Sequence, residues 1–285
     1  MKQFCRVCKS TDSKFIFEIS NNRFMRCCNC THVFLDGTYD EDSIKKLYEN
    51  YGGERGIAYF QGIDSEALTN IDMYLKLCRK YCRTKTSTLR LMDIGCGTGA
   101  LLDRAKKLGF AVEGIEICEP LAKDTAKRVG CSVHNDLLAH FNLAEESFDV
   151  ITMYDLIEHL QDPVSDVKII YDLLKTGGIL FILCPNEHAL IRKLSKLAYF
   201  LSFHHFNKPM QIMYYRDHLS YFTRKSLITF LKKFGFEIVF WETRNQELRR
   251  LQLSPTFRLL VRLNFHISRY FTTLGGKIIV YARKI

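Results

Sequence analysis

The sequence predicts a doubly wound α/β domain with a mostly parallel sheet, preceded by a small cysteine-rich ribbon. From position 89 onward, short apolar runs alternate with helical stretches of about 10–15 residues, as in a parallel sheet with crossover helices. A glycine-rich turn follows the first run, and two C-x-x-C pairs stand near the N-terminus. The chain has 285 residues, of which 47% are apolar, enough for the core of one such domain and a small appendage.

The expected elements follow one another along the chain. Strands are expected at 89–93, 110–115, 131–134, 148–153, 178–184, 236–241 and 277–283. Helices are expected at 68–81, 100–108, 189–206 and 224–234. The expected units are a ribbon at 1–38, a helical lid or linker at 39–85 and the α/β domain at 86–285. The segment 39–74 is rich in tyrosine, glycine and acidic residues, and its composition fits a lid over the site as well as a solvated linker.

The most informative stretch is the turn after the first strand. It reads Asp93-Ile-Gly-Cys-Gly-Thr-Gly99, with glycines at alternate positions. Glycine suits such a turn because a Cβ would occupy the ligand's volume and because the backbone often needs a positive φ. The spacing differs from the G-x-G-x-x-G dinucleotide fingerprint, and Asp93 would repel a pyrophosphate. The turn suits a ligand that carries an amino group and a sulfonium.

Two further acidic residues stand at the ends of the next strands. Glu116 follows the second apolar run, about 20 residues after the glycines, where a carboxylate can accept hydrogen bonds from ribose hydroxyls. Asp136 follows the third run and is placed to meet an adenine amino group. Both fall at the carboxyl edge, where open α/β sheets bind ligands.

These motifs resemble those of class I S-adenosylmethionine (SAM)-dependent methyltransferases. The glycine turn resembles motif I, and residues 148–159 resemble the fourth-strand motif of the small-molecule branch. The resemblance covers about residues 70–285 and implies the Rossmann-like methyltransferase fold, a seven-stranded sheet with its last strand antiparallel. It implies SAM as cofactor, and the expected binding residues are Asp93, Gly95, Cys96, Gly97, Gly99, Glu116, Ile117, Asp136, Leu137 and Tyr154.

The N-terminal cysteines predict a structural zinc site. Cys5 and Cys8 are separated by 18 residues from the pair Cys27 and Cys30, and four thiolates are a preferred ligand set of structural Zn²⁺. Four protein ligands leave no open position, so the ion would fold the ribbon without taking part in catalysis. The neighbouring Cys28 could replace Cys27, and the sequence leaves this choice open.

The cysteine content also bears on the compartment. The chain has 11 cysteines, and its first residues lack the apolar stretch of a secretory signal. Free thiols and metal ligands in a reducing, cytoplasmic compartment are therefore expected rather than disulfides. No run of 18 uncharged apolar residues is present, so no transmembrane segment is expected.

Positive charge is concentrated in the last third of the chain. Residues 1–188 carry 23 basic and 27 acidic residues, whereas residues 189–285 carry 18 basic and 4 acidic ones. The excess falls on two basic amphipathic insertions, at 189–225 and 244–275. In the first, one helical face is expected to carry Leu190, Ile191, Leu194, Leu197, Ala198 and Leu201. Such helices can lie on the inner membrane surface, attract anionic substrates or pack on their own domain; nucleic acid is a less favoured partner.

The catalytic residues are expected around two histidines. Residues 214–223 resemble a stretch of zinc-containing sugar C-methyltransferases, although Asp217 stands where that family has Glu. By this resemblance His218 would be the general base, Asp217 its orienting group, and Tyr215 and Tyr221 acceptor contacts. The adjacent carboxylate predicts a pKa near or above neutral for His218. His159, after the fourth strand, is the second candidate base, and the alternative for His218 is a cap of the helix at 224–234.

Three functions fit the sequence. The favoured one is SAM-dependent methyl transfer to a small molecule, such as a sugar or a glycan-linked or lipid-linked intermediate. The second is RNA methylation, supported by the ribbon and the basic C-terminal third. Against it, residues 154–157 read Tyr-Asp-Leu-Ile and not the Asn/Asp-Pro-Pro-Tyr/Phe used on base amino groups. The third is a non-catalytic SAM-binding module that has kept the fold. The intact glycine turn and acidic strand ends argue against it, since a relic without ligand need not keep either.

Overall fold

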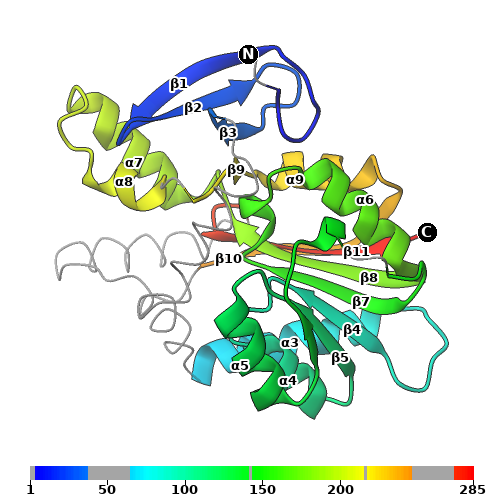
Figure 1. The fold of residues 1–285 in the computed structure, drawn as a ribbon. Coiled ribbons are helices and arrows are strands. Elements are labelled where there is room, and N and C mark those ends of the chain that lie inside the picture. The colour runs from blue at the N-terminus through cyan, green and yellow to red at the C-terminus, as the bar shows by residue number, and fades with distance from the viewer. Residues whose placement is uncertain (1–3, 38–64, 141–142, 215–216, 246–272) are drawn as a thin grey trace.

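The computed structural model describes residues 4–37, 65–140, 143–214, 217–245 and 273–285, and these form two sheets with flanking helices (Figure 1). The strands are β1 (Ser13–Ile19), β2 (Asn22–Cys27), β3 (Val33–Leu35), β4 (Arg90–Ile94), β5 (Ala111–Ile115), β6 (Ser132–His134), β7 (Phe148–Tyr154), β8 (Leu174–Pro185), β9 (Ser220–Tyr221), β10 (Phe236–Arg244) and β11 (Lys277–Lys284). The helices are α3 (Ser65–Tyr81), α4 (Ala100–Lys107), α5 (Glu119–Val129), α6 (Pro163–Leu173), α7 (Leu190–Leu201), α8 (Lys208–Met213) and α9 (Arg224–Lys232), with short 3₁₀ turns η2 (Leu138–His140) and η3 (Ile157–His159).

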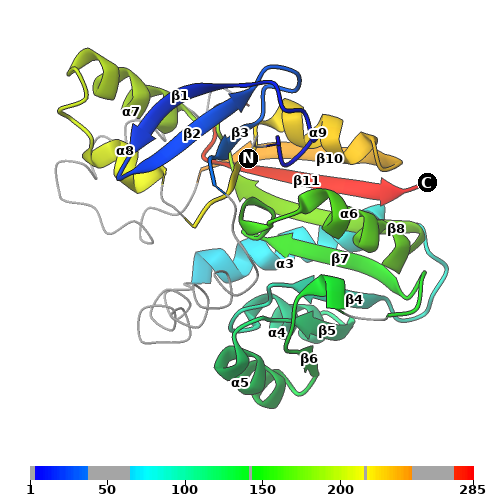
Figure 2. The same cartoon turned by 45° about the horizontal axis from the view of Figure 1, so that its top comes forward.

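The larger sheet has seven strands in the order β10-β11-β8-β7-β4-β5-β6, which can be followed in Figure 2. Strands β4 to β8 of this sheet are parallel, and β11 runs antiparallel to both of its neighbours. The predicted fold class, including the antiparallel last strand, is confirmed. Because β4 lies between β5 and β7, the strand order reverses there. In open α/β sheets, the crevice at the carboxyl ends of such strands binds the ligand.

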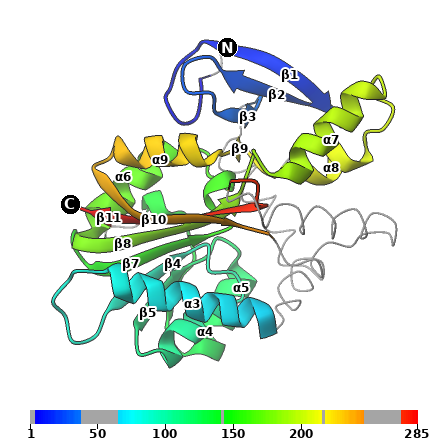
Figure 3. The same ribbon diagram turned by 180° about the vertical axis from the view of Figure 1, so that it is seen from behind.

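Helices cover both faces of this sheet. Helices α3 and α4 lie on one face and α6 and α9 on the other, as Figure 3 shows from behind. In β8, Leu180, Ile182 and Cys184 pack into one core, whereas Ile179 and Phe181 pack into the other. Both faces of the strand are therefore buried, which explains why it reads as a continuous apolar run.

The smaller sheet joins the ribbon to the α/β domain. Its strand order is β1-β2-β3-β9, and β9 comes from a segment far along the chain. Val33 pairs with Tyr221 and Phe34 with Ser220. Aromatic rings from both parts share one core; the ring centroids of Phe17 and Tyr214, for example, lie 4.8 Å apart. The cysteine ribbon is thus fixed at the segment that carries His218.

Two predicted segments lie wholly or largely outside the described residues. They are the lid or linker predicted for residues 39–85, of which 39–64 are not described, and the second basic insertion predicted for 244–275, of which 246–272 are not described. Within the described part, helix α3 packs against the large sheet through Ile71 and Leu75. The boundaries at 38 and 85 stay predictions. None of the described helices combines the length and the apolar character that crossing a membrane requires.

Candidate active site

The turn after β4 needs its glycines for both conformation and space. Gly95, Gly97 and Gly99 have φ values of +70°, +52° and +68°, a region that side-chain-bearing residues rarely adopt. A Cβ on Gly95 would lie 2.8 Å from the Leu156 side chain, and one on Gly99 would lie 2.4 Å from Thr125 Cγ2. The turn leads directly into α4. Its backbone is therefore held close to the carboxyl ends of β4 and β7.

Glu116 ties this turn to the end of β5. Its buried carboxylate accepts hydrogen bonds from the backbone N–H of Gly97 at 2.8 Å and of Cys118 at 2.9 Å. Burial raises the pKa of Glu116, and the two backbone donors partly oppose this shift. A carboxylate offers about four lone-pair sites, so two further donors, such as ribose hydroxyls, can still be accepted.

Asp93 is buried beneath the same turn. Its carboxylate accepts a hydrogen bond from the Thr152 hydroxyl at 2.6 Å, across from the neighbouring strand β7. Burial raises the pKa of Asp93 to about 7, and the nearby charge of Glu116 adds to the shift. A cationic ligand bound nearby would favour the ionised carboxylate.

The other predicted cofactor residues line the adjacent strand ends. Asp136, after β6, accepts a hydrogen bond from the Leu137 N–H at 2.7 Å and lies 2.9 Å from His140 Nδ1. The side chain of Asn135, which the sequence did not single out, donates to the Ile117 carbonyl at 2.8 Å. Cys96 is buried within the glycine turn, and Tyr154 is half-buried at the end of β7. Their contacts with a cofactor stay predictions.

The buried Glu158 and His218 and the half-buried His159 form a second cluster next to this crevice. The His159 and His218 rings meet edge to face, with centroids 4.7 Å apart. The His218 Nε2 lies 3.9 Å from Glu158 Oε1, and neither oxygen of this carboxylate has a hydrogen-bond partner in the described chain. The backbone fixes the arrangement, because the Leu219 N–H donates to the Glu158 carbonyl at 2.9 Å. The two histidines predicted as candidate bases are thus brought together.

The electrostatics of this cluster differ from the prediction. The pKa of His218 lies well below its ordinary value, first because the ring is buried and then because a proton on it would be repelled by His159, when that ring is protonated, and by the positive charges of Arg192 and Lys277. The pKa near or above neutral expected from Asp217 is therefore wrong; burial outweighs the adjacent carboxylate. Burial raises the pKa of Glu158 to about 8.

The backbone carbonyl of Asp217 accepts a hydrogen bond in this cluster, from His159 Nδ1 at 2.8 Å. The alternative role of His218 as a helix cap is also wrong, because Thr223 caps α9 through the Ser226 N–H. The roles of Asp217 and His218 in catalysis stay predictions.

A third group, which the sequence did not single out, adjoins these histidines. Glu187 is buried just beyond β8, accepts a hydrogen bond from the Tyr214 hydroxyl at 2.7 Å and pairs with Arg192 at 3.6 Å and with Lys196. The Arg192 guanidinium lies over the rings of Tyr214 and Tyr221, 4.8 and 5.1 Å from their centroids. Tyr221 lies against His218, with ring centroids 5.9 Å apart. Tyr215, predicted as an acceptor contact, lies outside the described residues.

The chemistry open to the histidine cluster follows from its donor atoms. The three side chains each offer one ligand atom, and these atoms lie within 4.8 Å of one another. A neutral imidazole beside a carboxyl can accept a proton from a substrate, and the same atoms could hold a metal ion.

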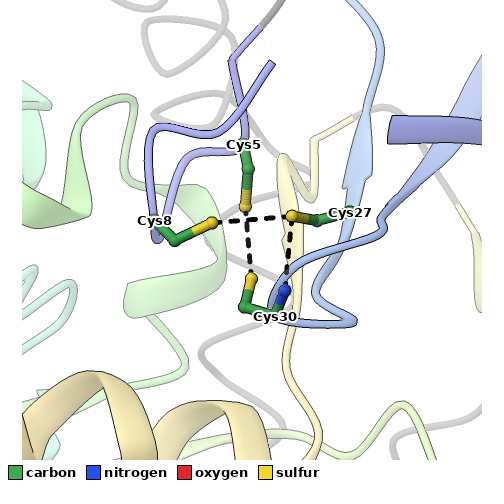
Figure 4. Close-up of side chains that lie close together, drawn as sticks. All are labelled: Cys5, Cys8, Cys27 and Cys30. Carbon is green, nitrogen blue, oxygen red and sulfur yellow. Dashed lines mark hydrogen bonds between the residues drawn. The ribbon is translucent and has the colours of Figure 1, made fainter. Parts of the chain in front are cut away.

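The four predicted zinc ligands converge in the ribbon (Figure 4). The Sγ atoms of Cys5 and Cys30 are 3.5 Å apart, as are those of Cys8 and Cys27. A tetrahedral zinc with Zn–S bonds of about 2.3 Å needs S···S distances of about 3.8 Å, close to this spacing. Cys28 is exposed and does not belong to the cluster, which answers the question left open by the sequence in favour of Cys27. The donor set fits a structural Zn²⁺.

Comparison with known proteins identifies the family of the α/β domain. Residues 69–240 match the model of a methyltransferase domain family. The chain is 38% identical over 96 residues to a ubiquinone biosynthesis O-methyltransferase of Ruegeria pomeroyi, covering 32% of this chain and 39% of that protein. The same-named enzyme of Haemophilus ducreyi is 36% identical over 120 residues, covering 38% of this chain and 51% of that protein. These matches thus span about half or less of the curated relatives.

Two solved structures share the fold. A SAM-dependent methyltransferase from Thermotoga maritima superposes with a TM-score of 0.54 at 18% identity, covering 84% of this chain and 99% of that one. One from Archaeoglobus fulgidus gives 0.51 at 19% identity, covering 86% and 100%.

Proposed function

The chain belongs to the class I SAM-dependent methyltransferases, and on that premise we propose that it transfers a methyl group from SAM to a hydroxyl group of a small molecule. The observation that carries the proposal is the adjacency of two buried clusters along one edge of the sheet. The glycine turn, Asp93 and Glu116 end β4 and β5, whereas Glu158 and His159 follow β7 within a single 3₁₀ turn. A cofactor at the first cluster would therefore present its methyl group toward the second.

In this proposal the cofactor supplies an activated methyl group, and the residues of the chain position and deprotonate the acceptor. Asp93 and Glu116 hold the positively charged and ribose ends of the cofactor. His218 accepts the hydroxyl proton, since its lowered pKa keeps the ring neutral at pH 7. Glu158, 3.9 Å from His218 Nε2, faces the imidazolium that results, and the positive charge formed there favours the ionised form of this carboxyl, which burial otherwise disfavours. Positioning and exclusion of water supply much of the remaining rate.

The acceptor is proposed to be a phenolic, sugar or lipid-linked hydroxyl compound. The names of the curated relatives support the transfer to oxygen. The buried Arg192–Glu187–Tyr214 group would form one wall of the acceptor pocket. The zinc is proposed to be purely structural: it holds the ribbon in place. Because β3 of the ribbon pairs with β9, it would also help to position the segment that carries His218. A cytoplasmic location stays a prediction.

The test is transfer of a labelled methyl group from SAM to a panel of hydroxylated quinone precursors, nucleotide sugars and lipid-linked glycans, with total RNA assayed in parallel. We expect one class to be methylated. We expect His218→Ala to lower turnover by about 10²–10⁴ while the affinity for S-adenosylhomocysteine (SAH) is unchanged. His205→Ala is the matched control, since that histidine is exposed in the loop between α7 and α8 and belongs to neither cluster. Full turnover by the His218 variant would refute its role as base, and methylation of RNA alone would refute the small-molecule acceptor.

A further inference from the structure

Helix α7 buries its polar face and exposes its apolar face, the reverse of the usual arrangement in an amphipathic helix. Its polar side faces the protein, where Arg192 and Ser195 are buried together with Tyr199. The Tyr199 hydroxyl donates to the carbonyl of Glu18 in β1 at 3.1 Å, and Arg192 pairs with Glu187. These contacts fix which side of the helix meets the ribbon. The leucine-rich side, expected from the sequence to form an apolar face, is directed away from the protein.

The exposed face of α7, the loop after it and α8 together carry most of the large exposed apolar side chains of the described residues. Seven of the ten large exposed apolar side chains lie between positions 194 and 212, and we call them the apolar patch: Leu194, Leu197, Phe200, Leu201, Phe203, Phe206 and Ile212. Leu201 is 71% exposed and Phe203 is 86% exposed. Figures 1 and 3 show α7 and α8 standing off the α/β core beside β1 and β2. Apolar side chains concentrated in this way mark an interaction surface.

The loop between α7 and α8 holds the most exposed ring in place. Phe203 and His204 have φ values of +48° and +71°, unusual for residues with bulky side chains. The His204 ring stacks on Tyr199 with centroids 4.5 Å apart, and the Phe206 N–H donates to the Ser202 hydroxyl at 2.9 Å. Strained backbone that the surroundings enforce is typical of functional segments. Here it presents Phe203 to the outside.

The charge around the apolar patch indicates what binds it. Residues 188–214 contain no Asp or Glu but four Lys or Arg residues. Lys193 on α7 and Lys208 at the start of α8 are exposed beside the patch. An apolar surface on a segment that itself carries positive but no negative side chains matches a bilayer with anionic headgroups, since the apolar side chains enter the acyl boundary and the lysines meet the phosphates.

We propose that the α7–α8 hairpin docks the protein onto a membrane surface that contains anionic lipid. The docking does not depend on methyl transfer. If the proposed function holds, the docking would also bring the acceptor pocket to the membrane. Helix α7 begins just after β8, next to Glu187 and the candidate acceptor pocket, so a lipid-anchored acceptor would reach the pocket at the bilayer surface.

The test is cosedimentation of the full-length, zinc-loaded protein with phosphatidylcholine vesicles, with and without phosphatidylglycerol. We expect binding to the anionic vesicles. We expect Leu201→Asp and Phe203→Asp each to lower the partition coefficient by about tenfold or more, because each removes a large apolar side chain from the interface. The double variant Lys193→Glu/Lys208→Glu should remove the preference for phosphatidylglycerol. Ile285→Asp, which changes a 74% exposed apolar residue outside the patch, should bind like the unmodified protein.

Failure of the unmodified protein to bind either vesicle would overturn the proposal, as would equal losses in the Ile285 variant. Sedimentation velocity without vesicles provides the other decisive result. A dimer that Phe203→Asp converts to a monomer would assign the patch to a second copy of the chain. SAH binding is measured on every variant. A variant that binds SAH but not vesicles has lost docking alone, whereas an unmodified protein that binds vesicles but not SAH would contradict only the proposed function.

Discussion

Replacing Gly99 by alanine tests how the cofactor turn is built. The new Cβ would lie 2.4 Å from Thr125 Cγ2 and 3.2 Å from Val129 Cγ2, and the residue would have to keep a φ of +68°. The left-handed backbone costs roughly 1–2 kcal/mol in a residue with a side chain. The overlap adds about 1–3 kcal/mol, as overpacking does in a well-packed core. We expect Gly99→Ala to lower the free energy of unfolding by about 2–5 kcal/mol.

The neighbouring threonine allows the two contributions to be separated. Thr125→Ser removes the clashing methyl and keeps the hydroxyl that donates to the Gly97 carbonyl at 2.8 Å. Alone it should cost about 1 kcal/mol, the loss of one buried methyl group. In the double variant the overlap is relieved and the backbone cost remains, so urea unfolding should show a favourable coupling of about 1 kcal/mol or more.

Calorimetry with SAH, run in parallel, should show weaker binding by Gly99→Ala and partial recovery in the double variant. Additive losses in the two single variants, or an alanine variant as stable as the unmodified protein, would refute the reasoning.

The remaining predictions concern protons, metal and a buried charge. The raised pKa of Asp93, about 7 against an ordinary value near 4, means that the folded state binds the proton more tightly. The contribution of Asp93 to stability should therefore fall as pH rises from about 4 to 7 and then level off, and Asp93→Asn should make the slope in pH-dependent urea unfolding shallower, because Glu116, Glu158 and Asp166 also have raised pKa values. Cys27→Ser should contain no zinc by elemental analysis and should melt at a lower temperature. Cys28→Ser should keep the zinc content and the melting temperature of the unmodified protein; zinc loss in both variants would contradict the ligand assignment. Glu187→Gln leaves the buried Arg192 without its anionic partner and should destabilise the fold by about 3–5 kcal/mol, which chemical denaturation can measure; a neutral effect would show that the pair is not needed.

The sequence was sufficient where the signal is local. The glycine turn, the carboxylates at strand ends and the C-x-x-C pairs are short motifs whose geometry follows from neighbouring residues. The apolar runs predicted the seven strands of the large sheet, although β8 begins at Leu174, earlier than expected. Strands β1, β2, β3 and β9 of the smaller sheet were not predicted. The choice between Cys27 and Cys28 as zinc ligand could not be made from the sequence, because it depends on which of the two thiols faces Cys5 and Cys8 in the folded ribbon.

The rest depends on contacts between distant segments. Nothing local in Ser220 and Tyr221 indicates that they pair with β3 of the ribbon. Helical periodicity gave the apolar face of α7 but not its direction, which is set by the burial of Arg192 against Glu187. The pKa of His218 likewise depends on burial among residues from several elements and not on its neighbour Asp217. A buried acid just after a strand, as at Glu187, is the one signal that could have revealed the third group.

The central claim is that the chain binds SAM at the carboxyl ends of β4 and β5. Its most direct test is calorimetric titration of the zinc-loaded protein with SAH, repeated on Glu116→Gln. We predict a single site with micromolar affinity that weakens by at least tenfold in the variant, because the amide loses the charge and one acceptor oxygen that hold the ribose. A folded protein that binds no SAH, or a Glu116 variant that binds it as tightly as the unmodified chain, would contradict the account.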